Sequence, residues 1–214
     1  VAYLLGALQL WTEAMQTVSI MIISVFMAVI IGTPVGVLSA RSNWFKAALT
    51  PVLDVMQTIP SFVYLIPVVM LLGIGKVPGL IAVCIYAIPP IVRLTNLGIR
   101  LVDADVMEAA DAFGASPRQK LFGVQVPLAL PNIFAGVNQT IMMALSMVVI
   151  ASMIGVRGLG QPVLQAINNQ YFTLGVMNGL AIVAIAITPL LESAHARGTP
   201  VFFSALPCHR TLPR

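Results

Sequence analysis

"EAADAFGASPRQKLFGVQVP", residues 108–127, is an unusually polar stretch in a very hydrophobic chain. Only 8% of the 214 residues are charged, while 59% are hydrophobic and the mean hydropathy is +0.99. The segment around this stretch nevertheless holds eight charged residues: Arg93, Arg100, Asp103, Asp105, Glu108, Asp111, Arg118 and Lys120. Charge gathered between two apolar blocks is typical of a loop that lies outside a membrane.

The composition itself predicts an all-α polytopic membrane protein, because ordinary soluble domains are far less hydrophobic. About 20 consecutive apolar residues cross a bilayer as a helix, and Val18–Val37 meets that length without a charge. Residue 1 is Val, so we expect a fragment or a chain that lacks its natural start, and we see no cleavable signal peptide at its first residues.

Hydropathy predicts about five membrane-spanning helices. Proline inside such helices is tolerated when neighbours satisfy the freed carbonyls. The expected spans are Thr17–Ala40, Ala48–Leu72 (interrupted by Pro51, Pro60 and Pro67), Val77–Leu97 (with Pro89 and Pro90), Asn132–Val156 and a fifth from Phe172 to about Ile187. The mixed stretch before Thr17, with Trp11 and Glu13, is expected to be an interfacial helix or the remnant of an earlier span.

The positive charges predict an orientation with the N-terminus outside, because cytoplasmic loops carry the excess of Lys and Arg. The cytoplasmic side would then hold Arg41, Lys46, Arg93, Arg100, Arg118, Lys120, Arg197, Arg210 and Arg214. The outer side would hold only Lys76 and Arg157. Residues 108–127 are therefore expected to face the cytoplasm.

Residues 188–214 differ from the rest of the chain. They hold four prolines, both histidines and three arginines without a helical period. A cytoplasmic tail is one interpretation, and an out-of-frame or artefactual ending is the other and the favoured one. In either case the fifth span would end near Ile187.

Within the polar stretch the pattern predicts a helix, a glycine turn and a second helix. An apolar stripe on 102–113 combines Val102, Val106, Ala109, Ala110 and Phe113. Gly114 stands where helices often end with a left-handed residue, and Ser116 and Pro117 are suited to begin a short helix that ends before Pro127. From these residues alone, an amphipathic loop on the membrane surface and a docking element for a cytoplasmic partner both remain possible.

The spacing of these residues resembles the EAA signature of ABC importer permeases. Glu108-Ala109-Ala110 is followed by Gly114 and by Val124-Gln125-Val126-Pro127, with Val in place of the family's Ile and Leu. In that family the loop forms coupling helices that sit in a groove of the ATPase subunit. The resemblance implies that Glu108, Ala109, Ala110, Gly114 and Pro127 couple this chain to an ATPase, which favours the docking element.

Residues 53–100 and 138–161 resemble the glycine betaine/proline subfamily of these permeases. The resemblance covers Thr17 to Ile187 and implies a MetI-like transmembrane domain over 17–187, with the EAA coupling loop at 98–127 and an atypical segment at 188–214. Arg157 departs from the small residue expected there. The implied partners are an ABC ATPase subunit, a periplasmic or lipid-anchored substrate-binding protein, a second permease copy and membrane lipid, in a bacterial inner membrane.

Other chemistries find little support in the sequence. Residues 155–161 contain glycines but not the Lys-Ser/Thr pair of a phosphate-binding loop, so they are interpreted as a tight turn and the energy source is expected to be another chain. Cys84, Cys208 and the two histidines do not have metal-site spacing, and Asp54 is expected to be interfacial. We therefore expect no enzymatic activity, catalytic residue, cofactor, metal or nucleic-acid partner.

Polar residues inside the spans are the candidates for a translocation path. Such side chains either join helices or line a path, and as a set we assign them to the path: Gln57, Thr58, Ser61, Asn138, Gln139 and Ser146, with Thr140 and Ser152 nearby. Trp11 and Trp44 lie near expected membrane edges, so a tight aromatic cage for a quaternary ammonium is not expected. Selectivity would then reside mainly in a separate binding protein.

The sequence thus predicts the permease subunit of an ABC importer for glycine betaine, proline betaine or proline. Three alternatives remain at this stage: an ABC permease for choline, carnitine or an amino acid, an ATPase-independent channel, and a membrane scaffold without transport.

Overall fold

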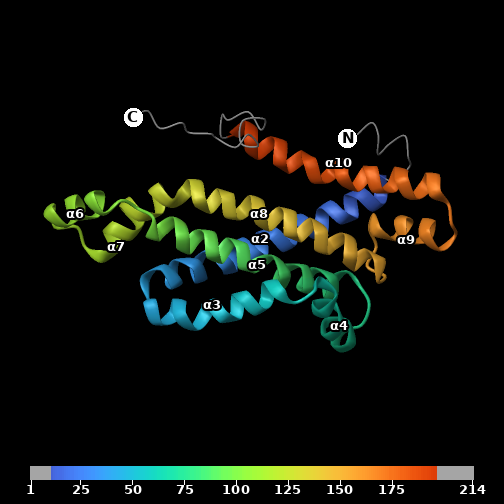
Figure 1. Ribbon diagram of the computed structural model, residues 1–214, viewed down its shortest axis with the longest axis horizontal. Helices are drawn as coiled ribbons and strands as arrows, with labels where there is room; N and C mark the ends of the chain where they lie inside the picture. The colour runs from blue at the N-terminus through green and yellow to red at the C-terminus, as the bar shows by residue number, and fades with distance from the viewer. Residues whose placement is uncertain (1–10, 197–214) are drawn as a thin grey trace, which may run out of the picture.

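The computed structural model describes residues 11–196, and within that range every regular element is a helix (Figure 1). The order is α2 (Trp11–Arg41), α3 (Asn43–Thr58), α4 (Ser61–Leu72), α5 (Lys76–Arg100), α6 (Ala104–Ala112), α7 (Pro117–Gln119), the π-helix η1 (Lys120–Gln125), α8 (Val126–Met153), α9 (Gly160–Asn168) and α10 (Phe172–Ala196). The all-α prediction is confirmed.

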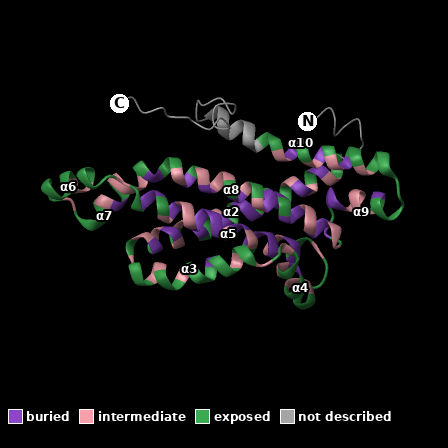
Figure 2. Ribbon diagram, in the orientation of Figure 1, coloured by how far each residue is buried: buried purple, intermediate pink, exposed green. Residues whose placement is uncertain are grey.

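Three long helices, α2, α5 and α8, form the centre of the molecule. Each is apolar and long enough to cross a membrane, with α7, η1 and α8 counted as one continuous 37-residue helix, Pro117–Met153. Figure 2 shows that the buried residues gather where these helices face one another, whereas α3 and α6 are mainly exposed. The core therefore depends on these three helices.

Small residues let the three backbones come close. A Cβ added at Gly36 of α2 would lie 2.7 Å from the Thr95 Cβ of α5, and one added at Gly98 of α5 would lie 2.7 Å from the Asn132 Cβ of α8. Gly136 of α8 is similarly close to α5, with 3.1 Å to the Ile91 Cδ1. Close backbone approach through small residues is the usual means of joining helices where lipid supplies no hydrophobic drive.

The second predicted span is broken in the structure. Over the predicted span Ala48–Leu72, α3 and α4 meet at a 94° bend, so they count as one broken span or a re-entrant loop. Ile59 adopts an extended conformation (φ −70°, ψ 129°) because it precedes Pro60. Pro51 and Pro67 remain inside their helices, so of these three prolines only Pro60 interrupts the segment.

Several predicted boundaries are also corrected. Trp11 and Glu13 belong to α2 itself, so residues 11–16 continue the first long helix, while residues 1–10 lie outside the described range. The fourth span starts earlier than Asn132, at Val126. The last helix continues past Ile187 to Ala196, which shows that the first part of the supposed tail is helical, while residues 197–214 lie outside the described range.

The number of spans depends on how the bend is counted. Among the described residues, three helices are long and apolar enough to cross a membrane, or four if the bent pair is one span. Phe172–Thr188 forms a shorter apolar helix at the position of the expected fifth span.

The close approach of α2 and α5 generates a prediction at Gly36. A Cβ there would also lie 2.9 Å from the Val92 carbonyl oxygen, which cannot move aside cheaply, so Gly36→Ala should lower stability by about 1–3 kcal/mol. At Gly179 of α10 a Cβ meets nothing within 4 Å, and Gly179→Ala should be neutral or stabilising. Thermal unfolding in detergent measures both, and equal effects at the two sites would contradict the packing argument.

Candidate functional site: the loop between α5 and α8

The loop that carries the EAA-like residues stands at one end of the molecule. α6 and α7 extend beyond the ends of α5 and α8, at the left of Figure 1. No residue of α6 is buried, and the Phe113 and Phe122 side chains are 92% and 68% exposed. The loop is thus presented outward instead of packing on its own chain.

The glycine turn is built as a Schellman motif. The Gly114 N–H donates to the Asp111 carbonyl (2.9 Å) and the Ala115 N–H to the Ala110 carbonyl (3.0 Å), which is the paired pattern that closes a helix C-terminus. Gly114 has φ +72°, while a Cβ there would meet nothing within 4 Å. The constraint at this position is therefore backbone conformation and not space, as the sequence predicted.

The second helix begins with a capping box. The Gln119 N–H donates to the Ser116 Oγ (3.4 Å), and the Ser116 N–H donates to the Gln119 Oε1 (2.8 Å), so two N-terminal donors are satisfied reciprocally. Pro117 follows at the first helical position, as expected. Across the turn, the Lys120 ammonium forms an ion pair with the Asp111 carboxylate, which ties the second helix to the end of α6.

The predicted end of the second helix before Pro127 is wrong. α7 continues through the π-helix η1 into α8, and Pro127 stands in the first turn of α8. Proline has no N–H and clashes with the carbonyl four residues earlier; here it directly follows the wider π turn, in which the Val126 N–H reaches the Leu121 carbonyl. Leu121 is 2% exposed and anchors the segment in the core beside Ile99 and Ala129.

The apolar stripe of α6 is largely uncovered. Val106 is 40% exposed, Ala109 and Phe113 are exposed, and Ala110 is partly covered. Glu108 is exposed as well, so four of the five predicted coupling residues share one small outward-facing unit, with Pro127 farther along the same chain. An ordered helix with a free apolar stripe and small residues is suited to docking against another surface.

The predicted path residues fall in two separate groups. Gln57, Thr58 and Ser61 flank the α3–α4 bend, while Asn138, Gln139 and Ser146 lie in the middle of α8. Gln57, Thr58, Gln139 and Ser146 are exposed in the single chain. The buried Asn138 Oδ1 has no hydrogen-bond partner within the described residues, and no hydrogen bond among them joins the two groups.

Thr58 and Ser146 donate to the Val55 and Met142 carbonyls (both 3.0 Å), and the buried Thr140 and Ser152 are hydrogen-bonded too. The buried Thr140 hydroxyl donates to the Gly136 carbonyl (2.8 Å). The Ser152 hydroxyl donates to the Val149 carbonyl (2.7 Å) and accepts from the Gly160 N–H (2.7 Å). The Thr140 and Ser152 hydroxyls therefore stabilise the fold.

Residues 155–161 form the expected tight turn, between α8 and α9. Gly155 has φ +110°, and the Leu159 N–H donates to the Thr17 Oγ1 of α2 (3.0 Å). In the sequence, Thr17 is only a lone threonine at the edge of an apolar run, so this role could not be read from its neighbours. The turn is thereby fixed to the start of the first long helix.

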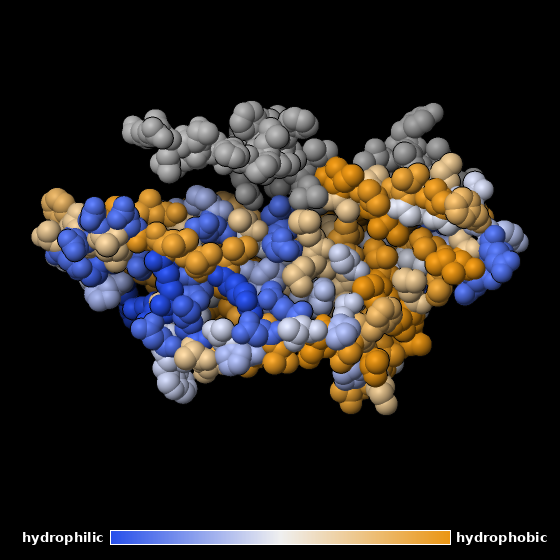
Figure 3. All heavy atoms as spheres, in the orientation of Figure 1, coloured by the Kyte–Doolittle hydropathy of each residue, from blue (hydrophilic) through white to orange (hydrophobic). Residues whose placement is uncertain are grey.

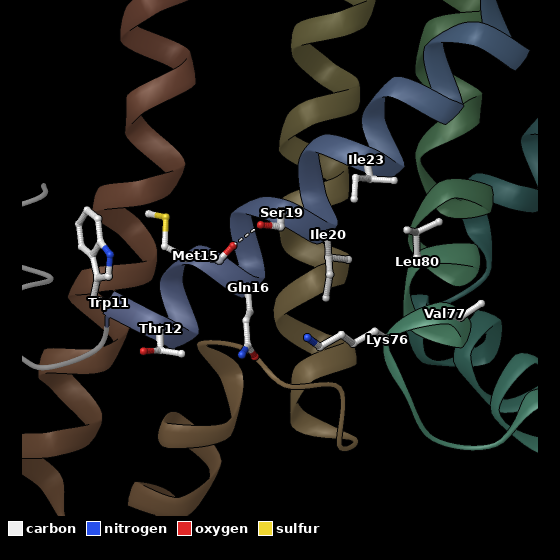
Figure 4. A pocket seen from close by; sticks show the side chains of 10 residues that line it. All are labelled: Trp11, Thr12, Met15, Gln16, Ser19, Ile20, Ile23, Lys76, Val77 and Leu80. Atoms are coloured by element: carbon white, nitrogen blue, oxygen red, sulfur yellow. Dashed lines mark hydrogen bonds between the residues drawn. The ribbon is translucent and has the colours of Figure 1, made fainter.

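A pocket of about 490 Å³ lies at the same end as this turn (Figure 4). Ile20, Ile23, Val77 and Leu80 give it apolar walls, while Gln16 and the Lys76 ammonium extend toward the same space. The pocket is open and mostly apolar, and the described residues contain no group of His, Cys, Asp or Glu that could hold a metal.

Asp54, which was expected at the membrane interface, has a partner that the sequence did not reveal. The Asp54 carboxylate forms an ion pair with Arg93 of α5, and both side chains are partly exposed. A carboxylate on one span and an arginine on the next were visible in the sequence, but their pairing required the register of α3 against α5.

The chain matches, over residues 32–193, the family described as "Binding-protein-dependent transport system inner membrane component". It belongs to this family. The membership confirms the resemblance to binding-protein-dependent importer permeases and the expected multi-pass protein of the inner membrane.

Several relatives within the family are very similar in sequence. The chain is 54% identical over 183 residues to "Glycine betaine/proline betaine transport system permease protein ProW" of Escherichia coli, covering 86% of this chain and 52% of that one. It is 50% identical to "Glycine betaine/carnitine transport permease protein GbuB" of Listeria monocytogenes, covering 86% and 65%. The chain thus spans about half the length of ProW.

A solved structure supports the fold. The permease in "Inward facing conformations of the MetNI methionine ABC transporter" superposes with a TM-score of 0.80, covering 90% of this chain and 95% of that one at 21% identity. The MetI-like architecture predicted from the sequence is confirmed.

The contact between Thr17 and the turn before α9 generates a second prediction. Thr17→Val should leave the buried Leu159 N–H unsatisfied and lower stability by about 1–3 kcal/mol. Thr188→Val is the matched control, because both hydroxyls also donate to the carbonyl four residues earlier but Thr188 is exposed. Thermal unfolding of the two variants is compared, and a loss confined to Thr188→Val would contradict the assigned role.

Proposed function

We propose that this chain is the permease subunit of an ABC importer that takes up glycine betaine or related osmoprotectants, driven by a separate ATPase subunit. The observation that carries the proposal is the outward-facing α6–Gly114–α7 unit, which bears the EAA-like residues. The names of relatives that are 46–55% identical to this chain support the solute class. ATP hydrolysis belongs to the partner, so this chain is a transport subunit and not an enzyme.

In the proposed mechanism, the loop docks into a groove of the ATPase. The exposed stripe with Val106, Ala109 and Phe113 would contact the partner, and the small Ala109 and Ala110 would allow close approach. ATP binding would close the ATPase dimer, push two such loops together and turn the path outward. The continuous helix from Pro117 to Met153 would carry that displacement into the membrane.

The proposed orientation puts the loop in the cytoplasm and the N-terminus outside. Arg41, Lys46, Arg100 and Arg118 lie toward the end that carries the loop, whereas Lys76 and Arg157 lie toward the other end. This asymmetry follows the positive-inside rule.

The translocation path is proposed to form between two copies of this chain or between this chain and a similar subunit. Gln139 and Ser146 are exposed on one side of α8 at a spacing of seven residues; the Ser146 hydroxyl donates to the Met142 carbonyl (3.0 Å), whereas the buried Asn138 Oδ1 has no hydrogen-bond partner in the described residues. Polar groups uncovered in the middle of an apolar helix require either a partner or a water-filled path. A substrate-binding protein on the outer side would supply most of the selectivity.

Choline is the second candidate solute. The chain is 30% identical over 194 residues to "Choline transport system permease protein OpuBB" of Bacillus subtilis, covering 90% of this chain and 89% of that one. Uptake of labelled glycine betaine in the presence of excess choline, carnitine or proline distinguishes these solutes.

The conformation of Gly114 predicts a selective effect on docking. Gly114→Ala places a residue with a side chain in the left-handed conformation, at a cost of about 1–2 kcal/mol, so co-purification of the ATPase should decrease. Gly114→Asp also adds bulk and charge, so co-purification should be lost. Gly123→Ala is the matched control, because a Cβ there is equally free but φ is not positive. Normal co-purification of Gly114→Asp would contradict the coupling assignment.

Glu108 should affect coupling more than folding, because its side chain is exposed and forms no ion pair in the described part of the chain. Glu108→Ala should reduce ATP-dependent glycine betaine uptake in proteoliposomes containing the complete transporter, while membrane insertion and thermal stability stay unchanged. A variant that fails to insert would argue for a structural role.

A further inference from the structure

A pocket of about 270 Å³ lies between α2, α3 and α5, toward the end that carries the coupling loop. Its walls combine apolar and cationic side chains. The residues that matter are the apolar Leu49, Leu53 and Leu97 and the cationic Lys46, Arg93 and Arg100. Figure 3 shows hydrophilic side chains gathered over this half of the molecule, while the other half is mainly hydrophobic.

The positive charge of the pocket is only partly neutralised. Arg93 is paired with Asp54, yet its Nε is buried and has no hydrogen-bond partner in the described residues. Lys46 forms no ion pair within residues 11–188. Three cations therefore face one carboxylate, and a buried guanidinium donor is left for a ligand that supplies an acceptor.

Arg100 is held in place by neutral groups. Its Nε donates to the Asn96 Oδ1 (2.9 Å), and its Nη2 donates to the Ser39 carbonyl (3.1 Å) and the Asn43 Oδ1 (2.8 Å). These contacts orient the guanidinium without cancelling its charge. Arg93, Asn96 and Arg100 follow one another at i, i+3 and i+7, so they share one face of α5.

The corner between α2 and α3 shows what kind of surface surrounds the pocket. Trp44 is 80% exposed in the first turn of α3, and an exposed Trp beside basic residues is typical of the membrane–water interface. A ligand here can place a charged group among the cations and a hydrocarbon chain against Leu97, which is 48% exposed. Basic pockets between helices on the cytoplasmic side are suited to anionic lipid headgroups.

We propose that this pocket binds the phosphate of an anionic phospholipid, held by Lys46, Arg93 and Arg100, with an acyl chain along Leu49 and Leu97. That the lipid comes from the cytoplasmic leaflet follows from the orientation proposed above. Binding of an anionic lipid to the pocket does not depend on that orientation. Of α3 only Leu53 is buried, so the lipid would bridge a loosely packed helix to α5.

Native mass spectrometry of the full chain in detergent tests the proposal without requiring the ATPase or uptake. Phosphatidylglycerol and phosphatidylcholine with the same acyl chains are titrated against the wild type, Lys46→Gln, Arg93→Lys and Arg118→Gln. Lys46→Gln should weaken phosphatidylglycerol binding about fivefold, the effect of one cation near a lipid surface. Arg93→Lys keeps the charge but loses the Nε donor, so it should also weaken binding.

Arg118→Gln is the matched control, because it removes one positive charge toward the same end but outside the pocket. It should leave phosphatidylglycerol binding unchanged, and phosphatidylcholine should bind weakly to every variant. Equal losses in Lys46→Gln and Arg118→Gln, or equal binding of the two lipids, would overturn the proposal. Thermal unfolding of each variant shows whether a loss of binding reflects a loss of folding.

Glycerol phosphate identifies the source of the phosphate. It carries the headgroup anion without acyl chains, so it should not displace phosphatidylglycerol at millimolar concentration. If it does, and if that binding also depends on Lys46, the ligand is a soluble phosphate anion and the lipid assignment is overturned.

Discussion

The close contact of the α2, α5 and α8 backbones is the constraint on which the rest of the structure depends. Lipid tails are as apolar as the helices, so the hydrophobic effect does not join helices inside a bilayer and van der Waals contact must do so. Glycines at the crossings, among them Gly36 and Gly98, remove the side chains that would keep the backbones apart. The C-terminal half of α5 is thereby fixed relative to α2 and α8, and the loop between α5 and α8 emerges from this closely packed base.

The loop keeps its shape by different means. It has almost no core of its own, since no residue of α6 is buried. Hydrogen bonds of the Schellman motif and of the capping box satisfy its backbone at the turn instead, and these bonds are local. The surface proposed to dock on the ATPase is therefore ordered in advance, which would reduce the entropy lost on docking. Leu121 connects this unit to the core at a single buried point.

The sequence predicted best what depends on local rules. The turn at Gly114, the cap at Ser116 and the apolar spans follow from residue types within a few positions of one another. The break at Pro60 was predicted, whereas interruptions at Pro51 and Pro67 and a helix end before Pro127 were predicted wrongly, because each proline was judged by itself. The surroundings of a proline decide whether the helix ends there: Ile59 before Pro60 is extended, whereas Pro127 directly follows the π turn Lys120–Gln125 and remains helical.

Contacts between distant segments could not be predicted. The pairing of Asp54 with Arg93 and of Thr17 with the Leu159 N–H requires the register of helices that are far apart in the chain. Neither pair has a sequence pattern, since isolated polar residues in apolar helices are common. The basic pocket escaped notice for the same reason, although the spacing of Arg93, Asn96 and Arg100 on one face of α5 was a signal that could have been used.

The α3–α4 segment is the part best suited to move. Only Leu53 of α3 and Leu65 of α4 are buried, whereas α5 has thirteen buried residues, and weakly packed elements open at low free-energy cost. Gln57, Thr58 and Ser61 stand at the bend between the two helices, and broken helices in transporters supply polar groups to a path at membrane depth. A path beside this bend could open by shifting α3 and α4 while the glycine contacts of α2, α5 and α8 remain in place. A lipid that joins α3 to α5 would then act on the mobile element and not on the rigid one, so its binding would bias the two arrangements of the path.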